Sequence, residues 1–108
     1  MKTARRRARE IALQALYAWQ VAGGDALAEA QALEDWGHCD QALAAALVRG
    51  VVADAARLQA RIAPHIDRKF SALSPVERAI LCIGAWELAE RPRGIGRGYN
   101  AVGNACNR

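Results

Sequence analysis

Apolar side chains recur at every third or fourth residue along most of this chain, and this spacing is typical of amphipathic helices. Alanine is the commonest residue and aromatic residues make up only 6% of the chain, a composition that favours helices over strands. We therefore expect an all-α fold, a small helical bundle whose 108 residues enclose one core. The helix expected over residues 3–22 has one apolar face, which consists of Ala8, Ile11, Ala12, Ala15 and Trp19. A second apolar stripe consists of Leu13, Tyr17 and Val21, and it predicts that this helix packs on more than one side.

Glycine and proline divide the pattern into four helical segments. In the third segment, Gly50 lies among large apolar residues, which indicates a close contact with another helix. The first segment is expected to begin at the N-cap Thr3 and to end at Gly23-Gly24, and the second to run from Asp25 to Trp36. The third is expected to run from Asp40 to Ala63, and an irregular linker to follow from His65 to Leu73. The predicted buried face of the third segment consists of Leu43, Leu47, Val51, Leu58 and Ile62.

The fourth segment has the clearest start signal in the sequence. Residues 74–77 read Ser-Pro-Val-Glu, in which serine caps the helix, proline takes the first helical position and glutamate bonds back to the cap. We expect this helix to continue to Glu90, with Glu87 and Glu90 facing solvent. Its apolar run consists of Val76, Ile80, Ile83, Gly84 and Leu88.

Positive charge is concentrated at the two ends of the chain. Residues 1–9 carry a net charge of +5, residues 10–90 carry −5 and residues 91–108 carry +4. Such asymmetry points to an anionic partner.

The arginines at the start of the first helix are in an unfavourable place. A helix N-terminus carries partial positive charge, so acidic residues would stabilise it better than Arg5, Arg6, Arg7 and Arg9. Their placement is explained if phosphates bind there, and Arg5 and Arg9 share a helix face on which both could contact one strand. The alternative is a solvated, charged helix end in which Arg6 pairs with Glu10.

Tyr17 follows on the same helix and has two interpretations. An aromatic ring near a basic patch can stack on a base of single-stranded RNA. Equally, Tyr17 can be a half-buried residue of the second apolar stripe.

Several classes of protein are disfavoured. Cys39, Cys82 and Cys106 are widely spaced, and with His38 and His65 they form no pattern of metal ligands. We expect Cys82 to be a small buried apolar residue. We find no catalytic constellation, no cofactor motif, no signal peptide and no membrane span, and we expect a cytoplasmic location.

Two longer motifs resemble one family. The first is residues 4–10, Ala-Arg-Arg-Arg-Ala-Arg-Glu, followed by Ala-Leu-Gln-Ala-Leu-Tyr over residues 12–17 and by Trp19-Gln20. The second is Leu-Ser-Pro-Val-Glu-Arg-Ala-Ile-Leu over residues 73–81, followed by Ile-Gly-Ala-Trp-Glu-Leu over residues 83–88. Both are similar to the NusB family of transcription antitermination factors, in the same order and at the same separation.

The resemblance implies a NusB-type helical fold and a function without catalysis. Proteins of this family bind single-stranded boxA RNA together with NusE, a ribosomal small-subunit protein, within the RNA polymerase antitermination complex that supports ribosomal RNA transcription. Carried onto this chain, the resemblance assigns RNA contacts to Lys2, Arg5, Arg6, Arg7, Arg9 and Tyr17 and partner contacts to Glu77 and Arg78.

The resemblance ends near residue 92, and this boundary suggests a NusB-like RNA-binding domain over 1–92 and an irregular, glycine-rich tail over 93–108. Family members continue with further helices, which this sequence lacks, so the apolar faces of the third and fourth segments are expected to be partly uncovered. We hypothesise that a frameshift or an error in the reading frame replaced those helices. Two alternative functions remain open: a detached RNA-targeting domain of a ribosomal RNA cytosine methyltransferase, and a general helical protein-interaction module.

Overall fold

The structure is a computed structural model, and it describes residues 2–90. The tail expected over residues 93–108 therefore lies outside the described residues. Every regular element within 2–90 is helical, which confirms the all-α prediction. The α-helices are α1 (Ala4–Ala22), α2 (Ala26–Gln31), α3 (Gln41–Ala53), α4 (Ala55–Ile62) and α5 (Pro75–Glu90), with 3₁₀ turns at Glu34–His38, Ala63–His65 and Phe70–Ala72.

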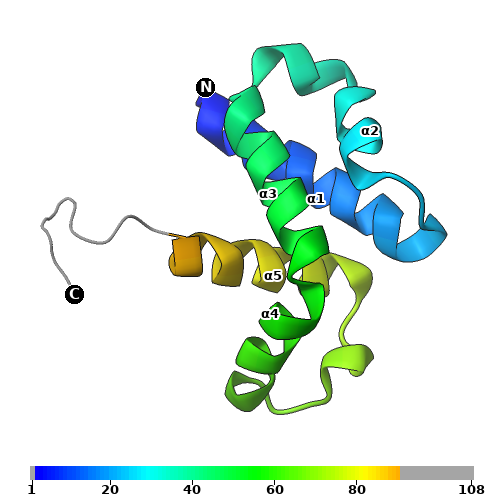
Figure 1. Ribbon diagram of the computed structural model, residues 1–108, viewed down its shortest axis with the longest axis vertical. Helices are drawn as coiled ribbons and strands as arrows, with labels where there is room; N and C mark the ends of the chain where they lie inside the picture. The colour runs from blue at the N-terminus through cyan, green and yellow to red at the C-terminus, as the bar shows by residue number, and fades with distance from the viewer. Residues whose placement is uncertain (1, 91–108) are drawn as a thin grey trace, which may run out of the picture.

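The helices form two groups that share α3 and α5 (Figure 1). In one group α1 packs against α2, α3 and α5; in the other, α4 packs against α5. α5 runs beneath the crossing of α1 and α3, and it contacts α1, α3 and α4 (Figure 1). This arrangement places the N-terminus of α1 at one edge of the molecule and the first turn of α5 beside the far end of α1.

The core is continuous through these helices. The largest fully buried side chains come from α1, α3 and α4, and several alanines allow the helices to approach closely. The predicted inner face of α1 is confirmed, because four of its five members are buried and Trp19 packs against the core from a partly buried position. The largest side chains are Ile11, Leu16, Leu47, Val48 and Leu58.

The predicted helix ends are confirmed where a cap or glycine defined them. The Thr3 hydroxyl accepts a hydrogen bond from the Arg6 amide, which caps α1. Gly23 and Gly24 end α1 with φ angles of 76° and 86°, a backbone conformation that residues with a Cβ rarely adopt. Asp25 and Asp40 cap α2 and α3 through their carboxylates.

The capping box at the start of α5 is also confirmed. The Glu77 amide donates to the Ser74 hydroxyl at 3.1 Å, and the Ser74 amide donates to the Glu77 carboxylate at 2.9 Å. These hydrogen bonds, the one from the Ser74 backbone first, lower the pKa of Glu77 below its ordinary value. The charged form of Glu77 therefore stabilises the folded state.

We expect this contribution to disappear in acid. A carboxyl whose pKa is lower in the folded state stabilises the fold above its unfolded pKa, about 4.3 for glutamate, and loses this effect as the pH falls through the folded value. Glu77→Gln keeps a side chain that can cap but removes the charge. Its melting temperature should be lower than that of the wild type at pH 7, and the difference should shrink below about pH 4. A difference that stays constant from pH 7 to pH 3 would contradict the assignment.

Two predicted boundaries were wrong. The second segment does not reach Trp36 as one helix, because α2 ends at Gln31, Leu33 is extended and a 3₁₀ turn follows. Leu33 and Trp36 still pack against the core, since a spacing of three residues also places side chains on one side of a 3₁₀ turn. The linker expected to be irregular contains the 3₁₀ turn Phe70–Ala72, and the turn Ala63–His65 lies where the third segment meets this linker.

The third segment is two helices and not one. At Asp54 the backbone leaves the helical region, with φ −109° and ψ 18°, and the chain bends between α3 and α4. The buried residues Val51 and Leu58 are seven positions apart, so the apolar period continues across the bend and does not reveal it. The bend allows α3 to pack on α1 while α4 packs on α5.

Two apolar faces expected from the sequence are only partly buried. In the second stripe of α1, Leu13 packs against the core as predicted, whereas Tyr17 and Val21 are 44% and 61% exposed. On α5, Val76, Ile80 and Leu88 are 41%, 52% and 67% exposed. The apolar residues of α5 occur on all sides of this helix, so periodicity could not select its inner face. That face consists of Ala79, Cys82 and Ile83. The exposed residues on α5 are consistent with the expected uncovered face.

Candidate nucleic-acid interface

The N-terminal turn of α1 carries the predicted cluster of positive charge. α1 begins at Ala4, so Arg5, Arg6 and Arg7 lie in its first turn, which contains no acidic residue. The side chains of Arg5 and Arg6 are 62% and 71% exposed. The dipole of α1 and these guanidinium groups therefore add their positive potential at one open edge of the molecule.

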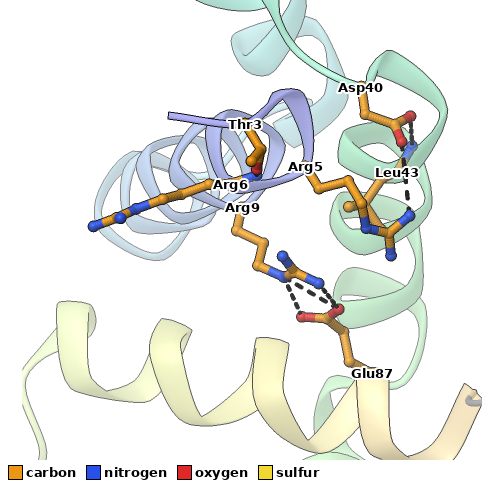
Figure 2. Close-up of polar contacts among 7 residues, drawn as sticks. All are labelled: Thr3, Arg5, Arg6, Arg9, Asp40, Leu43 and Glu87. Atoms are coloured by element: carbon orange, nitrogen blue, oxygen red, sulfur yellow. Dashed lines mark hydrogen bonds and ion pairs between the residues drawn. The ribbon is translucent and has the colours of Figure 1, made fainter. Parts of the chain in front are cut away.

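Arg9 differs from the other arginines because it is held by an ion pair. Its Nε and Nη2 atoms donate to the two carboxylate oxygens of Glu87 on α5, each at 2.9 Å in the shorter pairing (Figure 2). This bidentate bond raises the pKa of Arg9 above its ordinary value, first through the hydrogen bond and then through the charge of Glu87. Glu87 was predicted to face solvent, and this prediction was wrong.

Arg5 and Arg9 do share a face of α1, as predicted, but that face is turned toward acidic residues. Arg5 points to Asp40, with Nη1 3.9 Å from the carboxylate, and Arg9 points to Glu87 (Figure 2). The separation of Arg5 from Asp40 is too long for a strong hydrogen bond, and both side chains are partly exposed. A phosphate can therefore compete for Arg5 more easily than for Arg9.

Arg6 extends away from α3 and α5 (Figure 2). Its Nε atom is 4.0 Å from Glu10, and Lys2 forms the shorter pair with Glu10 at 2.9 Å. The predicted pairing of Arg6 with Glu10 thus exists as a weak, exposed contact. Among the described residues, Arg7 makes no ion pair. Neither Arg6 nor Arg7 is withdrawn from the surface, so both remain able to bind an anion.

Tyr17 lies on the same side of α1 as Arg6. Eleven residues make just over three helical turns, which aligns the two side chains at a separation of about 16 Å along the axis. Tyr17 is 44% exposed, so its ring is accessible to a base, and its role as an RNA contact stays a prediction. The structure does not bring Tyr17 next to the arginines, because three turns of α1 separate them.

Glu77 and Arg78 lie at the other end of α1. The Arg78 Nε atom donates to the Gln20 side-chain oxygen at 2.8 Å, and the Gln20 amide donates to the Pro75 carbonyl at 2.8 Å. These bonds join the last turn of α1 to the first turn of α5. The predicted RNA-contact arginines and the predicted partner-contact residues are therefore at opposite ends of one helix.

Sequence reasoning missed the two acidic residues that organise this edge, Asp40 and Glu87, as partners of arginines. No local pattern on α5 marks Glu87 as an ion-pair partner, and Glu87 lies 78 residues from Arg9 in the sequence. Long-range ion pairs of this kind depend on how the helices pack and cannot be found from local spacing.

We expect the Arg9–Glu87 pair to couple α1 to α5 by about 0.5–1 kcal/mol, because Arg9 is 42% exposed and solvent screens the pair. A double-mutant cycle of Arg9→Ala and Glu87→Ala, measured by urea unfolding, gives this coupling free energy. The matched exposed pair is Arg6→Ala with Glu10→Ala, whose coupling should be smaller. Equal coupling in the two cycles would show that the bidentate geometry has no special effect.

Other kinds of site are not found in the described part of the chain. Within residues 2–90, no group of three or more His, Cys, Asp or Glu side chains is placed to hold a metal ion. None of the helices described is both long enough and apolar enough to cross a membrane. Cys82 is buried, as predicted, and Cys39 is partly buried.

Comparison with known proteins gives a consistent result. The profile of the NusB family matches residues 6–94. The transcription antitermination protein NusB of Nitrosomonas europaea is 44% identical over 94 residues, which cover 84% of this chain and 56% of that protein. The NusB proteins of Dechloromonas aromatica and Paraburkholderia phytofirmans are 44% and 43% identical, covering 84% and 82% of this chain.

The chain spans 60% and 63% of the lengths of these last two relatives, so part of each relative has no counterpart in it. The family match begins at residue 6, so it includes three of the five basic residues of the N-terminal segment, Arg6, Arg7 and Arg9, together with the whole of α5. On the strength of this match, the chain belongs to the NusB family.

Proposed function

We propose that this chain is a non-enzymatic, cytoplasmic transcription antitermination factor that binds single-stranded RNA of the boxA type together with NusE. The observation that carries the proposal is the open cluster of Arg5, Arg6 and Arg7 in the first turn of α1, where the helix dipole already favours anions. The relatives named above are transcription antitermination proteins, which supports the same conclusion.

In this proposal the RNA backbone lies along the exposed side of α1. Arg6 and Arg7 bind phosphates at the helix start, with Lys2 and Arg5 beside them. Glu10 lies on the path, but Lys2 and Arg6 compensate its charge. About 16 Å further along α1, Tyr17 offers a ring on which a base can stack.

Arg9 has a different part in the proposal. Its guanidinium adds positive charge near the phosphates, but direct contact with RNA requires displacement of Glu87 from a bidentate bond. Arg9 therefore fixes the orientation of α1 relative to α5 more than it binds the strand. This view predicts a smaller loss of RNA affinity for Arg9→Ala than for Arg6→Ala.

The partner surface is proposed at the opposite end of α1, where Glu77 and Arg78 begin α5. Glu77 is exposed while its carboxylate caps the helix, so one oxygen can serve the cap and the other a partner's cation. RNA and NusE would then bind at the two ends of α1 without competing. Simultaneous binding is the expected result.

A binding titration tests the proposal. BoxA-like RNA is titrated into the chain with and without purified NusE at two salt concentrations, and fluorescence anisotropy reports the affinity. We expect binding to weaken at the higher salt, because phosphate contacts release counterions. We also expect binding to strengthen when NusE is present. An RNA of the same length and scrambled sequence is the control. Absence of RNA binding in all four conditions would refute the proposal.

The same titration separates the two alternatives. A general protein-interaction module would bind NusE with no effect of RNA. A methyltransferase targeting domain would prefer structured ribosomal RNA to the boxA strand. No observation on residues 2–90 favours either over the proposed function.

A further inference from the structure

A cavity of about 290 Å³ lies between the C-terminal half of α1 and the N-terminal half of α5. Residues of α3, α4 and the 3₁₀ turn Phe70–Ala72 complete its walls, which are mostly apolar and include Trp19, Phe70 and Cys82. It is partly open to solvent. None of the arginines in the first turn of α1 lines it, so it is separate from the proposed RNA site, whereas Arg78 in its wall also belongs to the proposed partner surface.

One wall of this cavity carries a fixed positive charge. The Arg78 guanidinium donates from Nε to the Gln20 side-chain oxygen at 2.8 Å, and from Nη1 to the Leu73 and Ser71 carbonyls at 2.6 and 3.3 Å. All three acceptors are neutral, and no carboxylate within the described residues pairs with Arg78. The guanidinium is therefore held in place without being neutralised, and its Nη2 atom keeps its hydrogen-bonding capacity.

The polar groups around the cavity also point to a ligand with one anionic end. Gln59 and Ser71 line it, and their side chains make no hydrogen bond among the described residues. A cation that is already oriented binds an anion with little loss of side-chain freedom. Attraction is stronger beside apolar walls than in water, because the local dielectric is lower.

The size of the cavity limits the apolar part of the ligand. An apolar cavity of about 150 Å³ holds one benzene molecule, and pockets for drug-sized ligands begin at about 300 Å³. At about 290 Å³ the cavity suits one ring with a short substituent, and it is small for a nucleotide with its sugar and phosphate. We propose that this cavity binds a small single-ring aromatic carboxylate, with the ring beside Trp19 and Phe70 and the carboxylate on Arg78.

Cys82 provides the measurement, because this residue lines the cavity and is 7% exposed. Burial raises the pKa of this thiol, so alkylation is slow and a bound ligand should slow it further. The isolated full chain is alkylated with iodoacetamide in the presence of phenylacetate, and mass spectrometry follows each cysteine. Cys39 lies outside the cavity and serves as the internal control.

For a ligand of this size we expect a Kd on the order of 1 mM. At about ten times this concentration, Cys82 alkylation should be roughly ten-fold slower while that of Cys39 is unchanged. 2-Phenylethanol and acetate, which lack the charge or the ring, should protect Cys82 much less. Arg78→Gln should abolish the preference for phenylacetate over 2-phenylethanol, and Arg78→Lys should restore part of it.

Equal protection by 2-phenylethanol and phenylacetate in the wild type would overturn the proposal, and this comparison needs no variant to fold. Protection by uridine monophosphate without protection by phenylacetate would also overturn it, since the cavity would then be a nucleotide site. Neither RNA nor NusE is present in the experiment. Failure of the proposed function would therefore leave this result unaffected.

Discussion

Replacing Arg5, Arg6 and Arg7 together by alanine is expected to weaken binding of single-stranded RNA on the order of 100-fold at about 0.1 M salt. Each lost phosphate contact lowers the slope of log K against log salt by about 0.7, so three contacts lower it by about 2. The fold should not suffer, because the arginines oppose the dipole of α1 and make only weak or exposed ion pairs. Anisotropy titrations at several salt concentrations measure both quantities.

The matched control removes three positive charges from another surface. Arg49, Arg57 and Arg61 are exposed on α3 and α4, and none of them pairs with an acid among the described residues. Their triple alanine variant has the same net charge as the first variant. We expect its affinity and salt slope to stay close to those of the wild type. An equal loss in both variants would mean that RNA responds only to net charge.

Gly50→Ala is expected to destabilise the fold by about 1–3 kcal/mol, although alanine is the better helix former by up to about 1 kcal/mol. A Cβ atom at residue 50 would overlap the indole of Trp86, which packs directly against the α3 backbone. To remove this overlap, the indole would have to leave its place between α3 and α5. Urea unfolding of the variant measures the change in free energy.

Gly84→Ala is expected to have the opposite effect on the stability of the fold. Gly84 is also inside a helix, but a Cβ there would have open space around it. This variant should be stabilised by about 0.5–1 kcal/mol, because alanine loses less backbone entropy on folding. In a Trp86→Leu background the cost of Gly50→Ala should fall. A neutral Gly50→Ala in the wild type would show that the close contact of α3 with α5 is absent.

Much of the fold could be predicted from local signals. Thr3, Asp25, Asp40 and the capping box at Ser74 each define a helix start through their own side chain, and the structure has all four. The position of Gly50 predicted a close helix contact, which Trp86 makes. These features depend on neighbours in the sequence or on the volume at one position.

The features that could not be predicted depend on packing between distant segments. The bend at Asp54 preserves the apolar period from Val51 to Leu58, so the sequence carries no trace of it. The inner face of α5 could be predicted only in part, because apolar residues occur on all sides of that helix. Ile83 is buried, but the rest of the inner face consists of the smaller residues Ala79 and Cys82.

The candidate site also combines features that local sequence predicts with features that depend on packing. The sequence predicts that arginines crowd the start of α1, and the structure places three in its first turn. It could not predict that Glu87, on a helix far along the chain, would bind Arg9 and leave Arg6 and Arg7 as the more available cations.

The most direct test of the central claim is to locate the RNA on the protein by NMR. A boxA-like single strand is titrated into the ¹⁵N-labelled chain, and chemical-shift changes are followed for backbone amides and arginine side chains. The largest changes should occur at Arg5, Arg6 and Arg7 and continue along the exposed side of α1 to Tyr17. Changes centred on Arg57 and Arg61 of α4, with none in the first turn of α1, would contradict it.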